Sequence, residues 1–229
     1  MKKVFIVFVM GFLVALPLAA SAALISTGSI NIAAYMPGST EGLGDFSGSL
    51  EYFYDDADAA IGRLVVKLTN TTPVGGGYLT GFLMNNPDPI TSISGFAAPN
   101  ATWQQLGLSD NGLSGNPFGD FDFGAALDGD FLGGGSPNDG IAVFDTGTFT
   151  FDFAGTALDA LTTLSFTQAF STDPPGSTYG PEFFLARFKG IDAGAGSDKV
   201  PAAVVPIPGT LILLGSGILA LVGLRRQLL

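Results

Sequence analysis

The sequence predicts an all-β body, an antiparallel β-sandwich that is jelly-roll-like. Three observations support this. Apolar and polar residues alternate at a period of two, turn-forming Gly, Pro and Asn residues separate the alternating stretches, and no stretch of the body has a long apolar run at helical spacing. Alternation places every second side chain on the same face, so each stretch is expected to be a strand with one buried face. Short strands joined by tight turns pair antiparallel and pack as two layers.

The clearest strands are expected at 62–70 and 147–155. In "GRLVVKLTN" the side chains of Leu64, Val66 and Leu68 share one face, and in "GTFTFDFAG" three phenylalanines alternate with threonine and aspartate in the same way. β-Branched and aromatic residues favour strands. Shorter segments with the same texture lie at 28–35, 50–55, 77–85, 90–96, 161–170 and 181–191.

The segment 108–140 is the least regular part of the body. It is rich in Gly and Asp, and a loop of this length inside a compact domain is usually functional or disordered. Its phenylalanines at 118, 121, 123 and 131 argue against disorder because aromatic side chains seek burial. We expect an ordered, irregular segment that packs on the sandwich.

The N-terminus has the features of an export signal. Lys2 and Lys3 precede an apolar stretch, and Ala20-Ser21-Ala22 supplies the small residues that signal peptidase requires. We therefore expect a signal peptide at 1–22, cleaved after about Ala22, and a mature body at 23–200.

The C-terminus has the features of a membrane span. A Pro- and Ala-rich linker is expected at 201–208, followed by an uncharged stretch at 209–224 that predicts a single transmembrane helix. Counted from Val204, the uncharged stretch just crosses a hydrocarbon core of about 30 Å at about 1.5 Å per residue. Arg225 and Arg226 end the span and begin a basic tail, 225–229, that stays cytoplasmic, so the body lies on the outer side of the inner membrane.

The residues before the span add a sorting motif. Val205-Pro206-Ile207-Pro208-Gly209, then the apolar span, then Arg225-Arg226, resembles a PEP-CTERM sorting signal. The likeness covers the last twenty-five residues, and Ile207 stands where the family's eponymous motif has Glu; Val-Pro-Ile-Pro resembles a frequent variant. The resemblance implies recognition and cleavage by exosortase, a membrane protease. It also implies a structural or exopolysaccharide-associated role in biofilm or floc, at the cell surface or in the extracellular matrix.

Composition excludes several function classes. The chain has no Cys and no His, which removes thiolate and imidazole zinc sites and the catalytic arrangements that need either side chain. Five basic residues face all twenty acidic residues in the body, so phosphate backbones are repelled and nucleic-acid binding is not expected. The sequence predicts a protein that is not an enzyme and has no obligatory cofactor.

Two alternatives remain open. The aspartates of the irregular segment could hold a calcium ion, although Leu132 occupies a ligand position of the EF-hand spacing that they partly match. A surface-attached polysaccharide hydrolase could use an acid and base drawn from Asp120, Asp122 and Glu182. A permanent envelope anchor that is never cleaved is a third reading. The calcium candidates are Asp120, Asp122, Asp128, Asp130 and Asp139.

Overall fold

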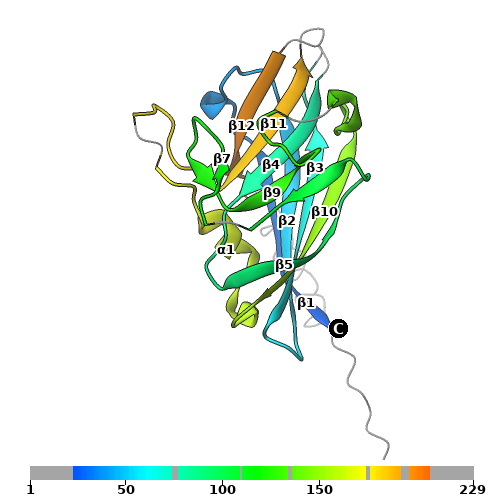
Figure 1. Ribbon diagram of the computed structural model, residues 1–229, viewed down its shortest axis with the longest axis vertical. Helices are drawn as coiled ribbons and strands as arrows, with labels where there is room; N and C mark the ends of the chain where they lie inside the picture. Colours follow the sequence, from blue (N-terminus) through cyan, green and yellow to red (C-terminus); the bar gives the residue numbers. More distant parts are fainter. Residues whose placement is uncertain are drawn as a thin grey trace, which may run out of the picture.

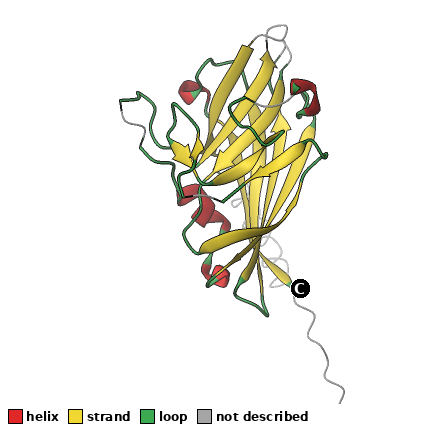
Figure 2. Cartoon of the chain, in the orientation of Figure 1, coloured by secondary structure: helices red, strands yellow, loops and turns green. Residues whose placement is uncertain are grey.

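The computed structural model describes residues 23–73, 77–108, 110–133, 136–173, 176–191 and 196–206. Strands dominate this part of the chain, and the helices are short and peripheral (Figure 2). The strands are β1 (Leu24–Ala34), β2 (Phe46–Asp55), β3 (Ile61–Asn70), β4 (Tyr78–Met84), β5 (Ile90–Ala97), β6 (Trp103–Leu106), β7 (Leu113–Ser114), β8 (Asp120–Phe121), β9 (Phe123–Leu127), β10 (Thr146–Gly155), β11 (Phe184–Ile191) and β12 (Gly196–Val204). The helices are 3₁₀-helices η1 (Met36–Gly38), η2 (Pro137–Asp139) and η3 (Leu158–Ala160), and one α-helix, α1 (Thr163–Gln168).

Ten of the strands form one antiparallel sheet in the order β5-β10-β3-β2-β1-β12-β11-β4-β9-β6, and β7 and β8 form a separate pair. The prediction of an all-β, antiparallel fold is confirmed. The two halves of the large sheet are hydrogen-bonded to each other through β1 and β12, where Ile32, Ala33 and Ala34 pair with Val204, Ala203 and Ala202. The large sheet therefore wraps round into a nearly barrel-shaped body (Figure 1).

The core lies between the two halves and is rich in phenylalanine. The predicted inward faces are confirmed, since Leu64, Val66 and Leu68 of β3 are fully buried, as are the phenylalanines of β10. Phe82 of β4 stacks on Phe184 with ring centroids 5.5 Å apart and meets Phe149 edge-on at 4.9 Å. Each such ring pair adds about 0.5–1.5 kcal/mol beyond area burial. The Phe184 contact joins neighbouring strands of one half, and the Phe149 contact binds that half to the other.

A second apolar cluster covers the outer face of β4, β9 and β11. Leu83 and Leu185 point outward from the sheet and are buried by Phe118, Phe121 and Phe131 of the irregular segment. The described part of that segment is thus ordered and packed on the sheet, as the sequence predicted. Three cations fasten it by donating to its backbone carbonyls: Arg187 to Phe131, Lys189 to Gly133 and Lys199 to Asn116.

One predicted strand is wrong. The segment 161–170 contains the helix α1 rather than a strand. Its buried residues, Thr163, Phe166 and Thr167, follow helical spacing, but two of the three are threonines and therefore do not register as an apolar stripe. The helix begins at a capping box in which the Ser165 hydroxyl accepts a hydrogen bond from the Thr162 N–H at 3.1 Å.

The linker expected from residue 201 begins later, because β12 continues to Val204. Pro201 fits within the strand because its carbonyl accepts the Tyr35 N–H at 2.8 Å. The N–H that proline lacks would point to that same side, so the ladder with β11 loses no hydrogen bond at this position. Residues 1–22 and 207–229, with the predicted signal peptide, transmembrane helix and basic tail, lie outside the described residues. Among those described, none of the helices has the length and apolar character that a membrane span requires.

Asp198 of β12 completes the joint between the halves. Its side chain is 1% exposed, and its carboxylate accepts hydrogen bonds of 2.7–2.9 Å from five residues of the loop that follows η1. Burial alone would raise the pKa of Asp198, but the hydrogen bonds outweigh it and hold the pKa below its ordinary value. The donors are the hydroxyls of Ser39 and Thr40 and the backbone N–H groups of Glu41, Leu43 and Gly44.

Substituting Asp198→Asn is expected to lower the free energy of unfolding by about 2–4 kcal/mol, because an amide NH₂ would face backbone donors in a buried site. Since the folded-state pKa is depressed, the carboxylate's contribution is full above the unfolded pKa of 3.8 and is lost as the pH falls through the folded value. Denaturant titration between pH 7 and pH 2 should show this acid loss in the parent and not in the variant. Asp145→Asn, at an exposed aspartate, is the control. If this substitution lowered the free energy of unfolding at pH 7 as much as Asp198→Asn does, the expectation would be contradicted.

Candidate functional site

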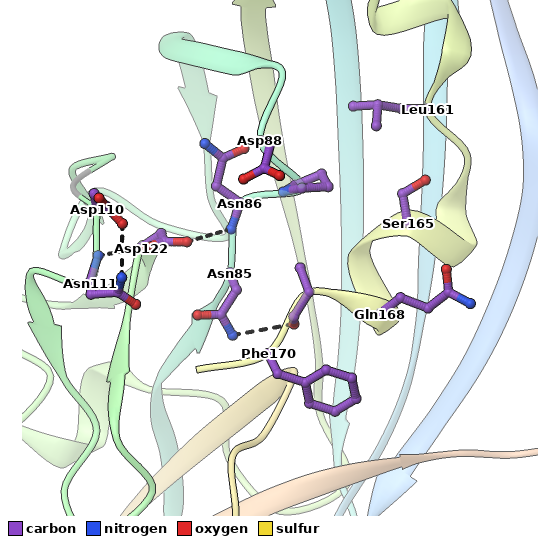
Figure 3. A pocket seen from close by; sticks show the side chains of 12 residues that line it. Asn85, Asn86, Asp88, Asp110, Asn111, Asp122, Leu161, Ser165, Gln168 and Phe170 are labelled. Carbon is purple, nitrogen blue, oxygen red and sulfur yellow. Dashed lines mark hydrogen bonds between the residues drawn. The ribbon is translucent and has the colours of Figure 1, made fainter. Parts of the chain in front are cut away.

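A polar pocket of about 460 Å³ is the candidate site (Figure 3). Four segments that are distant in sequence build it: the β4–β5 connection, the turn at 110–111, the bend between β8 and β9, and α1 with its flanks. A second hollow of about 370 Å³ adjoins it and shares Asn86, Asp88, Asp110 and Asp122 with it. The residues lining the first pocket are Asn85, Asn86, Pro87, Asp88, Asp110, Asn111, Asp122, Leu161, Ser165, Gln168, Ala169 and Phe170.

Asp122 organises the wall made by the two turns. It is 9% exposed, and its carboxylate oxygens accept one backbone N–H from Asn86 at 2.8 Å and one from Asn111 at 2.6 Å. Both turns reverse sharply, since Asp88 and Asn111 have positive φ angles of 68° and 51°. Asp and Asn tolerate this backbone region better than other side-chain-bearing residues. One carboxylate therefore sets the positions of two loops.

Two adjacent asparagines leave hydrogen-bonding capacity unused in this wall. Asn85 is 2% exposed, and its amide nitrogen donates to the carbonyls of Ala169 and Glu182. The amide nitrogen of Asn86 donates to Ile90. The two amide oxygens are buried, and neither has a donor among the residues that the structure describes. Unsatisfied buried acceptors are uncommon and costly, so two in one wall make this wall a candidate for a functional site.

The opposite wall comes from α1 and the residues that flank it. Ser165 and Gln168 present polar ends, whereas Leu161 and Phe170 present apolar surface. Phe170 is 55% exposed, with one ring edge against Phe183 at a centroid distance of 6.5 Å. An aromatic ring this exposed beside a pocket offers a flat apolar surface to a ligand.

The electrostatics of the pocket are one-sided. Asp88, Asp110 and Asp122 line it, and no lysine or arginine is among its lining residues. These carboxylates make an acceptor-rich cavity that suits a ligand with many hydrogen-bond donors. The turns that carry these residues, "NNPDP" and "SDNG", are visible in the sequence as turn-formers, but nothing in the sequence indicates that they meet α1.

The predicted calcium ligands do not gather. Asp122 is held by the two turns, Asp130 accepts the N–H groups of Leu132 and Gly133, and Asp139 lies in η2. The backbone N–H of Asp120 donates to the Thr172 hydroxyl, and Asp128 sits at a left-handed turn after β9. Within the described ranges, no group of three or more acidic side chains could hold a metal ion. Calcium binding stays a prediction that the geometry does not support.

The carboxylates of the hydrolase hypothesis are also separated by role. Asp122 lines the pocket, whereas Asp120 and Glu182 are not among its lining residues. Glu182 touches the site through its backbone, since its carbonyl accepts the Asn85 amide at 3.0 Å. Burial raises the pKa of its carboxyl to about 7. Catalysis by an Asp/Glu pair therefore stays a prediction.

Of the predicted sorting motif, Val205 and Pro206 are described. Both are exposed, and the Val205 N–H donates to the Asn31 carbonyl at 2.8 Å. Ile207, Pro208 and Gly209, and the predicted membrane stop at Arg225 and Arg226, lie outside the described residues.

Substituting Glu182→Gln is expected to stabilise the protein at pH 8 and to leave it unchanged at pH 4. The folded-state pKa of about 7 lies above the ordinary value of 4.5, so the carboxyl lowers the parent's stability progressively as the pH rises from 4.5 to 7. Because the side chain is only half-buried, we expect a gain of about 1 kcal/mol. Thermal melts of parent and variant at both pH values measure it, with Glu41→Gln at an exposed site as the control. A gain of equal size at pH 4 would contradict the titration argument.

Comparisons of the chain with protein-family models, with curated proteins and with solved structures gave no match.

Proposed function

We propose that this chain is an exported envelope or extracellular-matrix protein that exosortase recognises and cleaves, and that its β-rich body has a structural or exopolysaccharide-associated role. The signal-peptide features at 1–22 and the three-part motif that ends at Arg225-Arg226 support export and sorting. We further propose that the body is jelly-roll-like and that residues 209–224 form a transmembrane helix.

The observation that carries the proposal is where the fold stops. β12 pairs with β1 up to Val204, the Val205 N–H still donates to Asn31, and Pro206 is the first residue of the Pro-Ile-Pro motif. Prolines at 206 and 208 have no N–H with which to extend that ladder. A protease that cuts within 206–209 would therefore leave every described strand and every described hydrogen bond in place, so the body would stay folded after release.

The test is the C-terminal mass of the protein recovered from the cell surface, with and without exosortase in the same strain. We expect the mature chain to end upstream of the apolar span when exosortase is present and to keep its tail when exosortase is absent. Recovery of surface protein that still carries Arg225 and Arg226 would contradict processing and would favour a permanent anchor.

A matched pair of variants tests the motif itself. Pro206→Ala combined with Pro208→Ala should leave unprocessed chain in the membrane fraction, because the extended conformation that the protease requires is lost. Pro99→Ala, an exposed proline in the β5–β6 loop, should be processed like the parent. Equal processing of both variants would remove the prolines from the recognition step.

A further inference from the structure

We propose that the pocket between α1 and the 85–89 turn binds a neutral sugar, one hexopyranose unit of a glycan at a time. The inference rests on the glycan-associated role proposed above and adds a site and a ligand class to it. Three properties of the pocket lead to it: a surplus of hydrogen-bond acceptors, the absence of cations from its lining, and an aromatic ring on the wall opposite the polar groups.

The acceptor surplus selects a ligand rich in donors. Asp88 and Asp110 contribute carboxylates, and each oxygen of Asp122 accepts only one N–H and so retains a free lone pair. Figure 3 shows the Asn85 amide nitrogen directed at Ala169 and its oxygen directed away from α1, toward the wall of Asn111 and Asp122. That oxygen lacks a donor among the described residues, as does that of Asn86. Vicinal hydroxyl groups of a sugar are several hydrogen-bond donors on one uncharged ligand.

Charge excludes the acidic members of the same ligand class. No lysine or arginine lines either hollow, while three aspartates line both. A uronate, sulfate or phosphate would lose its hydration in an acidic pocket without gaining a cationic partner, which is strongly unfavourable. A bare divalent cation fits poorly as well, since the described carboxylates do not converge on a point.

The apolar wall matches the other side of a pyranose ring. Phe170 offers an exposed ring face, and Leu161 lies on the same side of the pocket. Sugars are amphipathic, with hydroxyl edges and a C–H face, and an aromatic ring opposite polar groups accommodates both. Gln168, which is exposed on α1, is a further lining residue on this side of the pocket.

The dimensions point to a glycan chain rather than an isolated monosaccharide. A volume of about 460 Å³ lies within the usual range of small-ligand pockets. The adjoining hollow of about 370 Å³ shares four lining residues with the pocket, so a second sugar unit would have a place next to the first.

The experiment titrates the exported, purified chain with the methyl glycosides of glucose, galactose, mannose and N-acetylglucosamine, followed by NMR chemical shifts. Methyl glucuronate and methyl glucosaminide serve as the anionic and cationic arms. We expect saturable shifts at 85–88 and 165–170 with at least one neutral glycoside, at a Kd of about 1 mM. Phe170→Ala and Gln168→Ala should each weaken binding at least 10-fold. The matched control is Phe144→Ala, which removes an even more exposed ring, 81% accessible, on the loop before β10.

Each remaining outcome overturns the proposal. These outcomes are no saturable shift with any neutral glycoside up to tens of millimolar, binding that both pocket variants leave unchanged, or tighter binding of the glucuronate or the glucosaminide. Phe170 is half-exposed and Gln168 is exposed, and unchanged melting temperatures of the two variants verify their folding. The C-terminal mass tests sorting independently of sugar binding. A pocket that binds no sugar would contradict this inference alone, and an uncleaved tail would contradict the proposed processing alone.

Discussion

The buried carboxylate of Asp198 is the constraint on which the rest of the structure depends. Only three residue pairs join β1 to β12, and the joint continues through the loop after η1, whose donors converge on this one side chain. Burying a charge is costly unless every lone pair is satisfied, so the loop must adopt one conformation to satisfy it. That conformation places β12 and, through it, β11, β4, β9 and β6 against β10. Without it, the Phe82 ring would lose its partners on the opposite half.

β4, β9 and β11 belong to the half of the sheet that follows β12, and they are buried on both faces. The cover on their outer face connects the core to the pocket. β4 and β11 carry apolar side chains inward and outward, so they require a cover, which the irregular segment supplies with Phe118, Phe121 and Phe131. Asp122 belongs to this cover, and its carboxylate positions the turns that form one wall of the pocket. The basic residues Arg187, Lys189 and Lys199 hold the cover down by its carbonyls. Burial lowers the pKa of all three, and the nearby charge of Arg187 lowers the pKa of Lys189 and Lys199 further.

Features that depend on neighbouring residues could be predicted from the sequence, whereas features that depend on contacts between distant residues could not. Period-two alternation is local, so the strands of Leu64 and Phe149 and their buried faces were predictable. The helix α1 was missed because threonines occupy two of its three buried positions. In the pocket, Asp122 was a candidate because of the aspartates near it in sequence, whereas the partners that the structure gives it, Asn86 and Asn111, are joined to it only by the fold. Contacts between residues 85 and 170 leave no trace in a single sequence.

The smaller hollow lies where the nearly closed sheet does not close completely. β5 and β6 are the two ends of the strand order, although only residues 98–102 separate them in the chain. β5 carries two bulged residues, Thr91 and Ser94, whose hydroxyls donate back to carbonyls of β10. Bulges bend an edge strand and prevent it from pairing further, either with β6 or with another molecule. The smaller hollow is lined by Thr91 at this edge and by Leu108 just beyond β6. The same irregularity that protects an exposed edge therefore keeps open the space in which a ligand can bind.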